Sequence, residues 1–181
     1  MPNSLSSLGD SAFDACYALA SISLPTGLAS IGVDEFCNCS PLTNVVIPGS
    51  ITSTGGDAFD YCTALASVTI PNNVTNIGPT AFNNCTPLKS VFCPGNAPAM
   101  VSEAFSGDGN ATVYYNPQTA GWGVFATETT VPVMAYNPQA GGFTVANSQF
   151  GFTVTGATNM LVVVEAATNL SGQDGSEHVQ S

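Results

Sequence analysis

The residue types best suited to chemistry in this chain are six cysteines, one histidine and twelve acidic side chains. Four of the cysteines recur at one fixed spacing, at Cys16, Cys39, Cys62 and Cys85. An even number of cysteines can form a disulfide framework. Residues that repeat in register, however, point in parallel into one interior, where a free thiol acts as a small hydrophobe. We therefore predict buried, reduced cysteines, with Cys93 also in the core.

A metal site is the alternative use of these thiols. Cys37 and Cys39 form a C-x-C pair, but a zinc site needs about four ligands. The histidine, His178, lies in the polar C-terminal stretch DGSEHVQ. The sequence therefore predicts no metal site and no cofactor.

Carboxylates also recur in register. Asp14 and Asp60 share one column with Asn83, and Asp34 and Asp57 share another. Carboxylates on adjacent coils could bind Ca²⁺ weakly or supply the acid pair of a glycosidase. The alternative, which we favour, is a solvated convex face, because a shallow array implies no cleft.

Nucleophilic catalysis finds little support. His178 has no neighbours that would fix its geometry, and Lys89 occupies an exposed strand position. The glycine-rich stretch GDGNAT lacks the strand, lysine and helix order of a phosphate loop. We therefore predict that the chain is not an enzyme and has no catalytic residues.

The charge excludes two classes of partner. The chain has a single basic residue and a formal net charge of −11. Nucleic acids and anionic membranes both require clustered Lys or Arg. No apolar run approaches the roughly 18 residues of a membrane span. The sequence predicts no nucleic-acid binding and no membrane insertion.

The elements that position these residues follow from a single repeat period. Prolines mark it at Pro2, Pro25, Pro48, Pro71 and Pro94. The other columns contain glycine (Gly9, Gly32, Gly55, Gly78), phenylalanine (Phe13, Phe36, Phe59, Phe82, Phe105) and leucine (Leu19, Leu42, Leu65, Leu88). A constant period of this length, in the range of leucine-rich repeats, indicates a solenoid.

Each coil has two parts. The segments LASISL, LTNVVI, LASVTI and LKSVFC alternate like strands, and the proline that follows ends each strand. The return segment, such as VTNIGPTAFNNC, is long enough for one or two helical turns. We predict an α/β solenoid of leucine-rich repeats, with a short strand and a short helix or turn in each coil. Thr54 replaces an apolar residue in this core, so its coil should be the loosest.

The pattern IPxxVTxIGxxAFxxCxxLxxVxI resembles the leucine-rich repeats of the BspA-like family of bacterial surface antigens, over residues 2 to about 105. The first residues already fit a repeat and no signal peptide precedes them, so we expect the chain to begin inside a longer protein. The resemblance implies a secreted or cell-surface protein that acts in adhesion or protein binding.

The C-terminal part, VPVMAYNP to VVVEAATNL, is similar to β-rich modules of secreted bacterial proteins. We predict a solenoid over residues 1–109 with four full repeats and a partial fifth, and an exit segment over 110–130. A partial β-sandwich-like module should follow over 131–170, and a disordered tail over 171–181. Trp122 is expected to pack the linker onto a strand, with sugar stacking as the alternative.

Partner binding is expected on the concave sheet. Strand alternation turns a polar, nearly uncharged set of side chains outward there: Ser21, Ser23, Asn44, Val46, Ser67, Thr69, Ser90 and Phe92. The expected partner is a protein or a glycan. The alternative function is carbohydrate or envelope binding by the C-terminal module, with the repeats as a spacer. The first coil has no cap, so we also expect fraying or self-association there.

Overall fold

The computed structural model describes residues 1–100, 103–136, 144–146, 149–155 and 159–164. The chain divides into two compact units, Met1–Tyr136 and Asn137–Ser181. The first unit is a parallel β-solenoid whose coils repeat at the spacing that the prolines predict.

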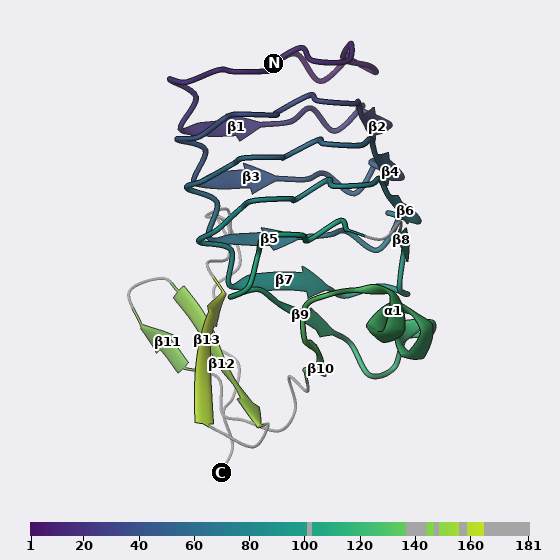
Figure 1. Ribbon diagram of the computed structural model, residues 1–181, viewed down its shortest axis with the longest axis vertical. Coiled ribbons are helices and arrows are strands. Elements are labelled where there is room, and N and C mark those ends of the chain that lie inside the picture. The colour runs from purple at the N-terminus through teal and green to yellow at the C-terminus, as the bar shows by residue number, and fades with distance from the viewer. Residues whose placement is uncertain (101–102, 137–143, 147–148, 156–158, 165–181) are drawn as a thin grey trace, which may run out of the picture. The chain divides into compact units, whose positions relative to one another are not determined.

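The longer strands of the solenoid form its first sheet (Figure 1). β1 pairs in parallel with β3 in a two-stranded ladder, and β5, β7, β9 and β10 form a four-stranded parallel ladder beside it, where β5 contacts β3. Equivalent residues meet across the ladder, for example Val68 with Val91 and Thr69 with Phe92. The strands are β1 (Ser21–Ser23), β3 (Asn44–Val46), β5 (Ser67–Thr69), β7 (Ser90–Cys93), β9 (Thr112–Tyr115) and β10 (Val133–Ala135).

A second parallel sheet follows a bend in each coil. Its strands are two residues long and pair in chain order. One residue of each pair points inward and the other outward, as expected for a period of two. These strands are β2 (Ser30–Ile31), β4 (Ser53–Thr54), β6 (Asn76–Ile77) and β8 (Ala99–Met100).

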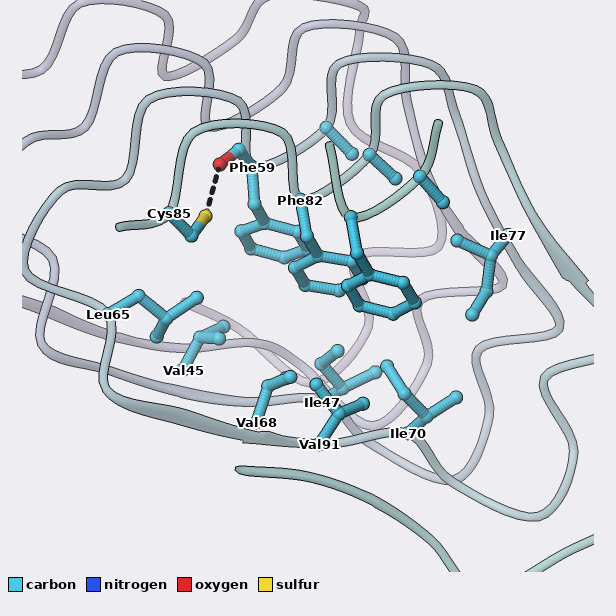
Figure 2. Close-up of a cluster of buried hydrophobic side chains, with 14 of the residues drawn as sticks. Val45, Ile47, Phe59, Leu65, Val68, Ile70, Ile77, Phe82, Cys85 and Val91 are labelled. Atoms are coloured by element: carbon cyan, nitrogen blue, oxygen red, sulfur yellow. Dashed lines mark hydrogen bonds between the residues drawn. The ribbon is translucent and has the colours of Figure 1, made fainter. Parts of the chain in front are cut away.

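The interior is filled by columns of identical or similar side chains. The five phenylalanines of the repeat stack face to face, with ring centroids 5.2–5.4 Å apart. Figure 2 shows Phe59 and Phe82 in this stack, with Val45, Val68 and Val91 of the first sheet below them. A single coil cannot bury such residues, so the core exists only because neighbouring coils supply both faces.

The third side of each coil carries the return segment, and here the predicted short helix is not formed. The segments at 33–38, 56–61 and 79–84 are consecutive turns. Two residues per coil, such as Asp34 and Asn38, have positive φ of 53° and 58°, which interrupts a helical run of dihedrals. We call the surface made by these turns the turn face.

The turns are held by backbone hydrogen bonds between coils. Alternate N–H groups donate to the next coil, as from Phe36 to the Ala58 carbonyl (2.9 Å) and from Phe59 to the Ala81 carbonyl (2.7 Å). All of these bonds point the same way along the solenoid. They satisfy the backbone without a helix, so of the two predicted alternatives, a short helix or a turn, the turn is formed.

The glycine column lets adjacent coils approach closely. A Cβ added to Gly55 would lie 2.5 Å from the Gly32 carbonyl carbon, and one added to Gly78 would overlap the backbone of Gly55. No side chain fits at these two positions without moving a coil.

Thr54 is buried as predicted, but its hydroxyl is not left without a partner. Its Oγ1 accepts a long hydrogen bond from the Gly78 N–H, at 3.4 Å. The free-energy cost of burying this hydroxyl group is therefore partly offset.

The two ends of the solenoid differ. Beyond β7, the strands β9 and β10 extend the first sheet, and helix α1 (Trp122–Glu128) follows β9. Trp122 is buried, stacks on Tyr115 at 4.8 Å and donates from Nε1 to Thr119 Oγ1 at 2.8 Å. The predicted packing role of Trp122 is thus confirmed, and its ring is not available for sugar stacking.

At the N-terminal end, the first coil is only partly covered. Residues 7 and 8 form no strand beside β2. The core columns of this coil are half-buried, at Leu8, Phe13, Cys16 and Leu19. The expected absence of a cap is consistent with this partial exposure.

In the second unit, β11 (Thr144–Ala146), β12 (Gln149–Thr155) and β13 (Asn159–Val164) form an antiparallel sheet. Three strands agree with the predicted β-rich character, but they do not test the sandwich. The predicted tail over 171–181 lies outside the described residues, and the domain boundaries stay a prediction.

Candidate binding surface

The outer face of the first sheet carries most of the side chains proposed for partner binding. On β1, β3 and β5 the outward residues are exposed, and they align in two rows across the strands. One row begins Ser21 and Asn44, and the other begins Ser23 and Val46. The face is polar and contains no charged side chain on these strands, and Val46 is its exposed apolar residue at 46% exposure.

On β7 the outward side chains are less exposed than on β1, β3 and β5. Phe92 was predicted to lie exposed on this face, but it is only 8% exposed. Its ring stacks on Tyr114 of β9, with centroids 5.4 Å apart. Ser90 is half-buried. The accessible surface is therefore limited to β1, β3 and β5, and Phe92 is part of an aromatic row rather than an exposed contact.

The turn face holds the acidic columns. Their carboxylates bind neighbouring coils through hydrogen bonds. Asp57 Oδ1 accepts from Thr80 Oγ1 at 2.6 Å, and Asp60 Oδ1 accepts from Asn83 Nδ2 at 2.9 Å. These acceptors are used within the protein, which favours a structural, solvated face over a calcium site.

Cys37 lies between Asp14 and Asp60 in the same column of the turn face. Burial first, and then the nearby carboxylates led by Asp60 and Asp14, together raise the pKa of its thiol to about 12. The thiolate is the nucleophile and the metal ligand, so a thiol that stays protonated at neutral pH does neither.

The cysteine column is a row of buried thiols. All six cysteines are free, and five of them are buried. Each buried column thiol donates to the phenylalanine carbonyl 26 residues earlier: Cys39 to Phe13 (3.1 Å), Cys62 to Phe36 (3.3 Å) and Cys85 to Phe59 (3.1 Å). Figure 2 shows the last of these bonds. The column is thus a hydrogen-bonded part of the core.

This arrangement makes a prediction about thiol reactivity. In denaturant, a colorimetric thiol reagent should find six reactive groups. In the native protein only Cys16, which is half-buried, should react quickly, because the other five thiols are buried and shielded from the reagent. Fewer than six thiols in denaturant, in protein freshly prepared without oxidant, would contradict the free-thiol column.

Two buried acids were not predicted. Glu35 occupies a column otherwise filled by Ala12, Ala58, Ala81 and Ala104. It is fully buried, its Oε2 accepts from the Gly32 N–H at 2.6 Å, and burial raises the pKa of its carboxyl. Asp108 is the second. Each of these acids replaces the residue type that fills the rest of its column, and this exception is visible in the sequence.

Within the described ranges, no three or more His, Cys, Asp or Glu side chains gather as a metal would require. The described residues likewise include no helix with the length and apolar character to cross a membrane. His178 lies outside the described residues.

Comparison with known proteins places the chain among repeat proteins of bacteria. It resembles the Treponema pallidum leucine-rich repeat protein TpLRR (28% identity, TM-score 0.55), over 58% of this chain and 50% of that one. It also resembles a leucine-rich repeat protein of Bacteroides ovatus (25% identity, TM-score 0.57), over 78% of this chain and 37% of that one. No curated protein matches it.

The pneumococcal vaccine antigen PcpA shares the fold at 19% identity, with a TM-score of 0.60, over 75% of this chain and 40% of its own. The chain thus spans half or less of the length of each of these proteins. The model of the BspA type leucine rich repeat region matches residues 1–112 in six copies. With the regularly spaced coils, the stacked phenylalanines and the parallel sheets, this match shows that the chain belongs to the BspA-type leucine-rich repeat family.

Proposed function

We propose that this protein is a non-catalytic, secreted or cell-surface repeat protein that binds a partner protein through the outer face of the first sheet. The observation that carries the proposal is the pair of aligned rows of exposed side chains on β1, β3 and β5. Membership of the BspA-type family supports the surface location and the adhesive role.

The chemistry of the face favours a contact of modest affinity. Ser, Asn and Thr side chains offer hydrogen bonds, but the face lacks the Trp, Tyr and Arg residues that dominate tight interfaces. Repeated rows of the same groups suit a partner that is engaged at several coils at once, because linked weak contacts add avidity.

A pair of matched variants tests this surface. Ser67→Lys places a charge on the β5 part of the accessible outer face, and Asn76→Lys places the same charge on the exposed side of β6 in the second sheet. Binding would be measured by surface plasmon resonance against a panel of immobilised extracellular-matrix proteins. We expect Ser67→Lys to weaken binding at least about tenfold, equivalent to about 1.4 kcal/mol, and Asn76→Lys to leave it unchanged.

A glycan array with the same two variants distinguishes the alternative function. Glycan binding that neither substitution alters would favour carbohydrate recognition by the C-terminal module and would count against the sheet. Equal weakening by both variants would contradict a localised face.

A second candidate activity is end-to-end association through the first coil. It is supported by three backbone carbonyls, of Asp10, Ala12 and Asp14, which accept no backbone hydrogen bond from the described residues. In later coils the equivalent carbonyls accept from the preceding coil. Light scattering after gel filtration should show a concentration-dependent mass that Phe13→Glu abolishes. Val46→Glu, at an exposed apolar residue of β3 that lies at neither end of the solenoid, is the matched control.

A further inference from the structure

Asp108 occupies the position at which the preceding repeats have a cysteine. It follows Cys16, Cys39, Cys62 and Cys85 in one column, one repeat after the last of them. Its backbone is arranged as theirs is, because its N–H donates to the Phe105 carbonyl at 3.3 Å, as the N–H of Cys62 donates to Phe59 at 3.2 Å. The side chain is buried, at 1% exposure.

The column also defines what lies in front of this side chain. The three preceding thiols donate to the phenylalanine carbonyl 26 residues earlier. The same rule directs the Asp108 carboxyl toward the carbonyl oxygen of Phe82. That oxygen already accepts from the Cys85 N–H, at 3.4 Å, and a carbonyl has a second lone pair for another donor.

An ionised carboxylate does not suit this position. Neither oxygen of Asp108 makes a hydrogen bond of good geometry among the described residues, although the backbone N–H of Cys85 lies near enough to act on the carboxyl. A carboxylate would bring a negative charge against a carbonyl oxygen in a buried site, and an unpaired buried charge is strongly unfavourable. A carboxylic acid carries an O–H donor and replaces the missing thiol.

We propose that Asp108 is a neutral acid that ends the cysteine column by donating to the Phe82 carbonyl, and that loss of its proton releases the last coil of the solenoid. The last coil, residues 103–111, leads directly into β9. Protonation of Asp108 therefore stabilises the packing of the last coil, and with it the C-terminal end of the solenoid.

The surroundings agree with this assignment. Burial raises the pKa of Asp108 to about 7; the backbone N–H of Cys85 opposes the rise, and the carboxylate of Asp60 adds to it. No cation is among the groups that act on it. The Cys85 thiol also has a raised pKa, first from its hydrogen bond with Cys62 and then from burial, with Asp108 contributing.

The direction of the pH effect follows from linkage. The folded protein holds this proton more tightly than the unfolded chain, whose aspartate has a pKa near 3.8. The stabilisation is therefore complete below about pH 4 and is lost as the pH rises through about 7. Carboxylates of ordinary pKa finish titrating below this range. Glu35, whose pKa is also raised, is common to the wild type and its Asp108 variants, so its effect cancels when they are compared.

The experiment is urea unfolding of the full chain at pH 5 and pH 8.5, for the wild type, Asp108→Asn and Asp108→Cys. The unfolding equilibrium constant of the wild type should rise about a hundredfold more than that of either variant, the expected linkage for a pKa raised to about 7. Asn keeps the shape and a donor without titrating, and Cys restores the column.

Equal pH dependence in all three proteins would overturn the proposal. Where a variant fails to fold, the wild type alone decides, through the ¹³C resonance of the Asp108 carboxyl carbon. A titration midpoint near 7 supports the neutral acid, and a midpoint below 5 overturns it. In the supporting case, amide exchange at residues 106–111, corrected for intrinsic rates, should accelerate above pH 7 relative to the coil at 36–42.

Discussion

Phe59→Ala should lower the free energy of unfolding by about 3–5 kcal/mol, the range measured for removing a buried aromatic side chain. Phe59 is fully buried and stacks on two rings, Phe36 at 5.3 Å and Phe82 at 5.2 Å. Its removal leaves a gap in the middle of the column that neither neighbour can fill, because the coils are fixed by hydrogen bonds on three sides. Chemical denaturation with far-ultraviolet circular dichroism measures the loss.

Phe13→Ala is the matched control for this effect. Phe13 is half-buried and touches one ring of the column, Phe36. Its removal should cost less than half as much. Since coils interact only with their neighbours, Phe59→Ala should also broaden the transition, as the two halves of the array unfold less cooperatively. Equal losses for the two variants would contradict a cost that is set by burial and by stacking on two rings.

Gly55→Ala is expected to destabilise the protein by about 2–4 kcal/mol, at or above the usual range for overpacking. The added Cβ would lie 2.5 Å from the carbonyl carbon and 2.6 Å from the carbonyl oxygen of Gly32. These are backbone atoms, so no rotamer change relieves the contact. The coils must separate, and the parallel pairing of β2 with β4 is the first interaction lost.

Gly49→Ala provides the comparison for Gly55→Ala. A Cβ at Gly49 meets nothing within 4 Å. Both substitutions reduce the entropy of the unfolded chain equally, so the difference between them isolates the steric term. Thermal unfolding monitored by calorimetry gives both values. A Gly55→Ala protein as stable as Gly49→Ala would show that adjacent coils separate at little cost.

Much of the solenoid was predictable because its information is periodic. Phe36, Phe59 and Phe82 recur at one spacing, and a residue type that repeats in register must face the same environment in every coil. The inward side of the strands followed from Val45, Val68 and Val91 by alternation alone. The buried state of the cysteines followed from the same argument, without any knowledge of their hydrogen bonds.

The return segment was harder to predict from the sequence. Its length and its Phe–Cys spacing are compatible with a helical turn as well as with other turns. Asn and Asp adopt positive φ more readily than most residues, but the sequence alone does not show that Asp34 and Asn38 do so. That conformation is set by hydrogen bonds to the next coil, which are long-range in sequence. The prediction that Phe92 is exposed was wrong for a related reason. Its ring packs on Tyr114, and this contact exists only because β9 joins the sheet.

Exceptions to the columns carried information that the repeats did not. Glu35 replaces alanine and Asp108 replaces cysteine, and both prove to be buried acids. The polar rows proposed for binding, in contrast, carry little information about function. Their outward position was predictable from alternation, but the identity of a partner is not encoded in Ser and Thr side chains that would suit many surfaces.

The one-way hydrogen bonds of the turn face have an electrical consequence. In each coil, three peptide groups point their carbonyls toward the first coil and their N–H groups toward the last, as at residues 33–38. Their dipoles add along the stack, much as peptide dipoles add along a helix. The edge of the first coil is therefore the negative pole, and Asp10 and Asp14 reinforce it. Two such edges repel each other, whereas a further coil or other surface that stacks on this edge is favoured when it presents N–H groups or positive charge.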